Sequence, residues 1–81
     1  MEKRIAVVGI VVEDLDNAPI VNSILHSFSD IIVGRLGIPY REKNISVISI
    51  IVDGTSDEIS SMTGKLGRIN GINVKTAITK K

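Results

Sequence analysis

Two runs of apolar residues constrain the fold of this chain more than any other feature. They span Ile5–Val12 and Ile45–Val52, and both are dense in valine and isoleucine. β-Branched side chains favour extended backbone, so each run is predicted to form a strand. In both runs apolar residues occupy positions on either side of the strand. This pattern is typical of central strands that are covered on both faces.

A polar segment, residues 13–17, separates the first run from an amphipathic helix. Asp16 or Asn17 is predicted to accept hydrogen bonds from the free amides at the helix start, and Pro19 fits the first turn. Apolar residues then recur at intervals of three and four, which predicts about three helical turns. These residues are Ala18, Val21, Ile24, Leu25 and Phe28.

Between this helix and the second apolar run, the pattern predicts a strand and a loop. Ile31–Leu36 reads as the strand, and Gly37–Asn44 as a polar loop. Pro39 has no amide donor and argues against a continuous strand there. After Ile45–Val52, the pair Asp53 and Gly54 is predicted to end the third strand.

The last third of the chain predicts a second helix and a fourth strand. Thr55–Glu58 matches a capping box, in which side chains and backbone amides satisfy each other at a helix start. A helical stripe follows and Gly67 is a natural stop, after which Asn70-Gly71 indicates a turn. Alternation over residues 72–79 predicts a half-buried strand. The stripe consists of Ile59, Met62, Leu66 and Ile69.

The predicted order is therefore β-α-β-β-α-β in a single domain over residues 1–81. Right-handed crossovers fold such a chain into a four-stranded antiparallel sheet with both helices on one face, the α+β ferredoxin-like arrangement. Helices on one face leave the apolar side chains of the other face uncovered, and soluble monomers rarely expose large apolar patches. We therefore expect a homo-oligomer, a dimer or a tetramer.

Composition excludes several classes of protein. An 81-residue chain without cysteine has no disulfides or thiolate metal sites, and its one histidine is too few for a zinc site built on imidazole. The formal net charge of +1 and the two aromatic residues argue against direct nucleic-acid binding. No apolar run is long enough for a membrane span. We expect a cytoplasmic protein with no metal site and no cofactor.

Three candidate sites remain, each with a structural alternative. The acidic turn that contains Asp14 and Asn17 either caps the first helix or binds a ligand at the free amides of the helix start. Arg35 interrupts an apolar strand, either as an edge charge that prevents aggregation or as the counter-charge of an anion at a subunit interface. The loop with Tyr40 and Arg41 is either solvated or binds a partner protein.

A fourth pattern is weaker, and no pattern supports catalysis. Asn22, His26 and Asp30 follow one another at intervals of four. His26 is either a solvent-facing or partly buried structural histidine, or one ligand of a metal shared between subunits. The sequence contains no Ser/His/Asp set in a recognisable context and no compact pair of carboxylates, so we predict that the protein has no catalytic residues and is not an enzyme.

Two resemblances bear on function. The segment Val11–Asp14 leading into a helix, and the later segment Ile69–Val74, resemble ACT-type regulatory domains. The stretches 24–26, 30–40, 46–49, 52–55 and 63–67 are similar to small proteins named as regulators of the iron-only hydrogenase system. That family is similar in fold to the C-terminal domain of the nickel-responsive repressor, which binds nickel through several histidines and a cysteine. This sequence has a single histidine and no cysteine, so the nickel site does not carry over.

The resemblance implies an oligomeric, ACT-like regulatory module that senses a small ligand at a subunit interface and has no DNA-binding domain of its own. It also implies hydrogenase-maturation proteins as partners. Two alternatives stay open: a structural or assembly protein that acts through protein contacts without a small ligand, and an enzyme of the ferredoxin-like class.

Overall fold

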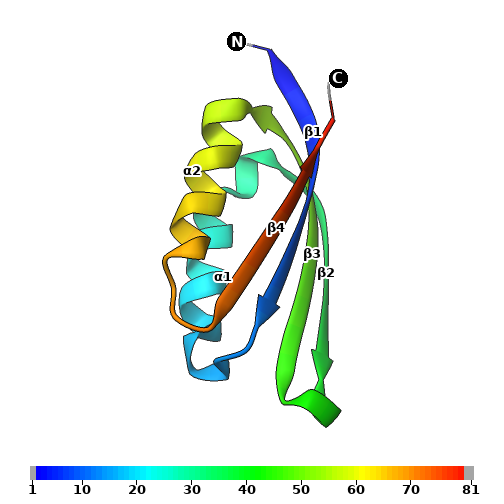
Figure 1. Ribbon diagram of the computed structural model, residues 1–81. Helices are drawn as coiled ribbons and strands as arrows, with labels where there is room; N and C mark the ends of the chain where they lie inside the picture. The colour runs from blue at the N-terminus through cyan, green and yellow to red at the C-terminus, as the bar shows by residue number, and fades with distance from the viewer. Residues whose placement is uncertain (1, 80–81) are drawn as a thin grey trace.

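The computed structural model describes residues 2–79 as a four-stranded sheet with two helices packed on one of its faces (Figure 1). All strand pairs are antiparallel, and the spatial order is β2-β3-β1-β4. The elements are β1 (Lys3–Val12), α1 (Ala18–Ser27), β2 (Ile32–Tyr40), β3 (Ile45–Thr55), α2 (Ser56–Gly67) and β4 (Ile72–Ile78), with short 3-10 turns at Leu15–Asn17, Ser29–Ile31 and Arg41–Lys43. The predicted α+β ferredoxin-like fold is confirmed.

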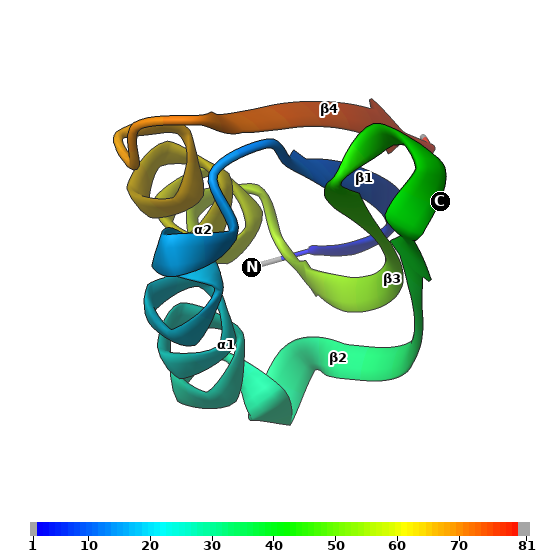
Figure 2. The ribbon, with the colours of Figure 1, turned by 90° about the horizontal axis from the view of Figure 1, so that it is seen from below.

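The hydrophobic core lies between the helices and one face of the sheet. Figure 2 shows these two layers, with both helices on the same side of the strands. Alternate residues of β1 and β3 point into it and are fully or nearly fully buried. The helices contribute the side chains at the predicted three- and four-residue spacing. The buried helix residues are Val21, Leu25, Ile59, Met62 and Leu66.

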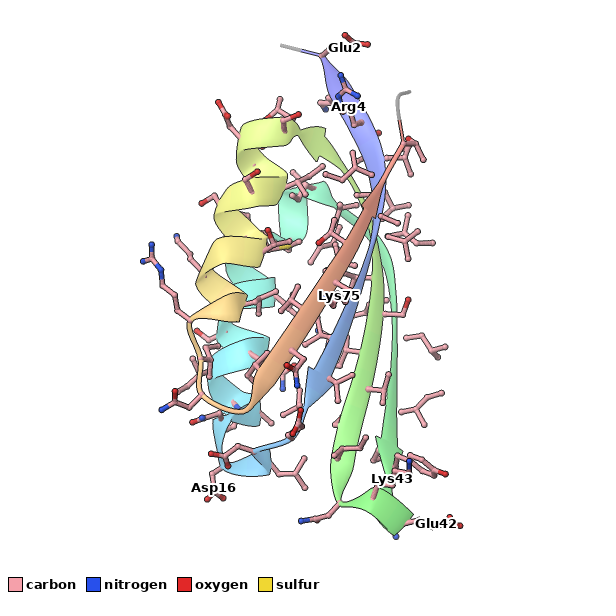
Figure 3. All side chains as sticks on the ribbon, viewed as in Figure 1. Glu2, Arg4, Asp16, Glu42, Lys43 and Lys75 are labelled. Atoms are coloured by element: carbon pink, nitrogen blue, oxygen red, sulfur yellow. The ribbon has the colours of Figure 1, made fainter. Side chains whose placement is uncertain are left out.

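The other face of the sheet, called the open face below, is apolar and uncovered. Side chains project from it on the side away from the helices (Figure 3). The β1–β3 register sets Val7 opposite Ile51 and Val11 opposite Val47, and β2 adds Leu36, Ile38 and Tyr40. The large exposed residues of this face are Ile5, Val7, Leu36, Ile38, Tyr40, Val47 and Ile51.

Two predicted boundaries were wrong. Residues Gly37–Tyr40 continue β2 rather than forming a loop. Pro39 is tolerated because β2 is an edge strand with one neighbour, so a missing donor on the outer side breaks no ladder bond. β3 also runs on to Thr55, since Asp53 and Gly54 pair with the beginning of β1.

The two helix starts differ. At α2 the predicted capping box is complete, because the Thr55 amide donates to Glu58 Oε1 at 2.8 Å and the Glu58 amide donates to Thr55 Oγ1 at 3.2 Å. At α1, Pro19 lies in the first turn, but Asn17 makes no side-chain cap hydrogen bond. Asp14 instead caps the preceding 3-10 turn, so the predicted roles of Asp16 and Asn17 as caps were wrong.

Candidate functional site

A cleft of about 370 Å³ opens between α1 and β2, on the helical side of the sheet. Its polar groups come from α1 with the turn that follows it, and from β2, which is the next strand in the sequence. The base of the cleft is apolar. The lining residues are Asn22, Leu25, His26, Ser29, Ile32 and Arg35.

Helical spacing supplies one wall of this cleft. Asn22, Leu25, His26 and Ser29 follow one another at intervals of three, one and three, which places them on one side of α1 and its continuation. Leu25 from this set is also part of the core and is almost fully buried. The helical wall therefore combines a fixed apolar base with polar groups at the rim.

A β-bulge supplies the other wall. The register of β2 against β3 shifts between Ile32, which is opposite Val52, and Gly34, which is opposite Ile51. Adjacent residues alternate faces in a regular strand, so Ile32 and Arg35 would lie on opposite faces without the bulge. The extra residue, Val33, brings both side chains to the helical face, where they line the cleft.

Among residues 2–79, Arg35 makes one hydrogen bond, and it lies in this cleft. Its Nη2 donates to Asn22 Oδ1 at 3.1 Å. A guanidinium has five N–H donors, so most of its donor capacity is left for other partners. Among residues 2–79, no carboxylate forms a salt bridge with Arg35. The cleft thus presents a positive charge with a planar array of free donors.

The acidic turn forms a separate cluster whose polar groups are mostly occupied within the chain. Asp14 accepts from the Asp16 amide at 3.1 Å and from Asn17 Nδ2 at 3.4 Å, and Asn17 Nδ2 also donates to the Asn70 carbonyl at 2.9 Å. The amides of Glu13 and Asp14 donate to the Gly71 carbonyl. These bonds tie the start of the first helix to the turn before β4.

Gly71 shows how closely this cluster is packed. Its φ is +76°, a conformation that favours glycine, and a Cβ built there would lie 2.5 Å from Asp14 Cβ. Asn73 Nδ2 also donates to Glu13 Oε1 in the same cluster. The acidic turn therefore has a structural role, because its hydrogen bonds hold the start of α1 against the turn before β4.

The predicted ligand set is divided between these two places. Asp14 and Asn17 lie together in the acidic turn, whereas Arg35 lies against Asn22 in the middle of α1. Tyr40 and Arg41 are neighbours at the tip of the β2–β3 hairpin, which projects beyond the start of α1 (Figure 1). Asn44 closes this tip in the left-handed conformation, at φ 56°.

Sequence reasoning noted Asn22 and His26 on one helix face but did not join them to Arg35. The structure places both in the cleft with Arg35, while Asp30 does not line it. Ser29 and Ile32 were missed, although helical spacing after Asn22 and His26 gave a usable signal for Ser29. Within the described part of the chain, no group of three or more His, Asp or Glu side chains could hold a metal ion.

The fold and its layers define a small ferredoxin-like α+β protein. The chain belongs to the TM1266-like family, described as "Iron-only hydrogenase system regulator, putative", whose model matches residues 4–76. It is similar to the solved structure of the uncharacterised protein TM1266 from Thermotoga maritima, with 44% identity and a TM-score of 0.92 over 98% of this chain and 100% of that one. The search of curated proteins found no match.

Two more distant structures share the fold alone. One is CPII from Thiomonas intermedia K12, a nitrogen regulatory PII-like protein bound to ADP, AMP and bicarbonate, with 12% identity, a TM-score of 0.53 and coverage of 96% of this chain and 92% of that one. The other is the divalent ion tolerance protein CutA1 from Ehrlichia chaffeensis, with 18% identity, a TM-score of 0.51 and coverage of 100% and 86%. The resemblance to ACT-type domains and to the nickel-responsive repressor stays a prediction.

No helix among residues 2–79 is both long enough and apolar enough to cross a membrane.

Proposed function

We propose that this protein is a cytoplasmic, ACT-like regulatory module of the iron-only hydrogenase system that works as a homo-oligomer and senses a small ligand. Family membership supports the link to the hydrogenase system. In this proposal the protein has no catalytic activity and acts on other proteins rather than on DNA directly. The observation that carries the oligomeric part is the open face, which is apolar across β1, β2 and β3.

A second copy of the same chain is the occupant that best fits this face. The charged residues on it have both signs, with Asp53 on β3 and Lys75 on β4, so two copies related by a two-fold axis need not repel each other.

Native mass at micromolar concentration tests this proposal directly. The wild-type chain should have the mass of a dimer or a larger even assembly, and Ile51→Asp should reduce it to a folded monomer, because a carboxylate would be buried in an apolar interface. Ile20→Asp is the matched control. Ile20 is 49% exposed on α1 and Ile51 is 45% exposed on the open face, so the same substitution at similar exposure should leave the mass unchanged.

A monomeric wild-type protein would contradict the proposal. So would an Ile51→Asp variant that kept the wild-type mass, because the assembly would then use another surface.

A second candidate function is an assembly protein that binds hydrogenase-maturation proteins through the hairpin tip. Tyr40 and Arg41 lie at the β2–β3 hairpin tip. The projection of this tip beyond the start of α1 favours such a function (Figure 1). Binding of purified maturation proteins should then be lost in a Tyr40→Ala/Arg41→Ala variant and kept in Ile51→Asp. Equal binding by the wild type and the Tyr40→Ala/Arg41→Ala variant would reject the tip.

A further inference from the structure

We infer that the cleft between α1 and β2 binds a small organic anion, a carboxylate or a phosphate monoester with a short apolar part. The inference rests on the proposed function, for which it names the class of ligand and moves the site away from the acidic turn. It is carried by the arrangement of Arg35, Asn22, His26 and Ser29 around the apolar base formed by Leu25 and Ile32.

The charge of the cleft selects an anion. Arg35 is the positively charged group in the lining, and no aspartate or glutamate is among the lining residues. A guanidinium matches the two oxygens of a carboxylate or a phosphate with parallel hydrogen bonds. The bond from Arg35 to Asn22 Oδ1 uses one donor and holds the side chain over the cleft, which leaves the other donors for the ligand.

The other polar side chains of the cleft can donate hydrogen bonds to an anion, and none of them carries a negative charge that would offset the charge of Arg35. His26 and Ser29 lie on the same side as Asn22, and both side chains can donate to an oxygen. They lie toward the end of α1, so the ligand would sit between Arg35 and this rim. A cation would meet no acidic partner in this lining, which is why the cleft discriminates against amines.

The base of the cleft selects the remainder of the ligand. Leu25 is 1% exposed and fixed in the core, and Ile32 is partly buried beside it. A short branched alkyl group could cover this apolar surface and gain free energy by leaving water. The volume of about 370 Å³ lies at the lower end of the range for small-molecule sites, so the ligand is small.

The alternative role of Arg35, as an edge charge that prevents aggregation, accounts for less of the geometry. The bulge at Val33 turns Arg35 to the helical face, where it reaches Asn22. Protection of the edge alone requires neither that contact nor the polar rim opposite it.

The test uses three probes on the full chain: isovalerate, its neutral analogue isovaleramide, and inorganic phosphate. Amide chemical shifts in ¹H–¹⁵N spectra give the site and the affinity. Isovalerate and phosphate should shift the amides of Asn22, His26, Ser29 and Arg35, with isovalerate binding more tightly, and isovaleramide should not. Shifts by isovaleramide equal to those by isovalerate would overturn the assignment of an anion.

Variants locate the charge that binds the probes. Arg35→Gln should weaken the binding of isovalerate by about ten- to a hundredfold, since it removes charged hydrogen bonds. The affinity of Arg35→Lys should lie between those of the wild type and Arg35→Gln. Arg68→Gln is the matched control at an exposed position of the α2 C-terminus and should bind as the wild type does. Equal affinity in Arg35→Gln and Arg68→Gln, or no shift with any probe, would reject the site.

The native mass of the same samples separates this inference from the proposed function. An oligomer that binds no anion would reject the cleft alone. A monomer that binds isovalerate through Arg35 would support the cleft and reject the oligomeric regulator.

Discussion

The two faces of the sheet use the same strands and the same kinds of side chain, yet only one of them is covered. In β3, Ile50 is 0% exposed and the next residue, Ile51, is 45% exposed. The helices bury the first through contacts within one chain, whereas the second has no cover among residues 2–79. Stabilisation of the covered face should therefore be independent of protein concentration, while that of the open face should depend on it.

The adjacent isoleucines give the largest expected difference. Ile50→Ala should lower the free energy of unfolding by about 2–5 kcal/mol, because it leaves a cavity in the core. This loss should be the same at all protein concentrations in urea titrations. Ile51→Ala should cost less at low concentration and progressively more as the oligomer forms. Equal, concentration-independent losses at both positions would remove the distinction between the two faces.

The cap of α2 tests whether the covered face depends on its helix. Thr55→Ala should lower the free energy of unfolding by about 0.5–2 kcal/mol, because the Glu58 amide loses its acceptor at Thr55 Oγ1. Thr55→Ser keeps the hydroxyl and is the matched control. A loss that grew with protein concentration would indicate that the cap also supports the contact between subunits.

A glycine inside α2 offers a change in the opposite direction. Gly64→Ala should stabilise the protein by about 0.5–1 kcal/mol, since an added Cβ meets nothing within 4 Å and alanine favours the helix. Gly71→Ala is the contrasting control, at positive φ and against Asp14, and it should destabilise. Thermal unfolding of both variants measures the difference, and a destabilised Gly64→Ala would show that α2 makes a contact on that side.

Acid should weaken the same helix start by a smaller amount. Hydrogen bonding to the Thr55 backbone amide, and second to its hydroxyl, lowers the pKa of Glu58 below its ordinary value of 4.5. A carboxylate with a lowered pKa contributes its full stabilisation above the ordinary value and loses it as the pH falls through the lowered one. Urea midpoints should fall less steeply with acid in Glu58→Gln than in the wild type. Identical slopes would contradict this role.

The sequence predicted the covered face well because its signals are local. Helical spacing identified Val21, Leu25, Ile59, Met62 and Leu66, and the capping box marked the first residue of α2. The sequence also showed that β1 and β3 are apolar on both sides, which is the basis of the oligomer prediction. The homo-oligomer itself stays a prediction.

The features that the sequence did not predict depend on contacts between residues that belong to different elements. Pro39 is compatible with β2 only because that strand lies at the sheet edge, and Asp53 remains in β3 because it pairs with Ile5. Arg35 was singled out from its strand, and Asn22 and His26 from their helix. That the three share one cleft follows from the bulge and from how α1 lies across β2, and neither can be read from periodicity.

The bulge at Val33 also means that β2 contains one residue more than its pairing with β3 requires. Removal of that single residue would leave Ile32 opposite Val52 and Arg35 opposite Ile50, so regular alternation would keep both on the helical face. Leu36 would likewise stay opposite Ser49 on the open face. The edge strand can therefore change its length by this one residue and still have one surface for a small anion and another for a second subunit.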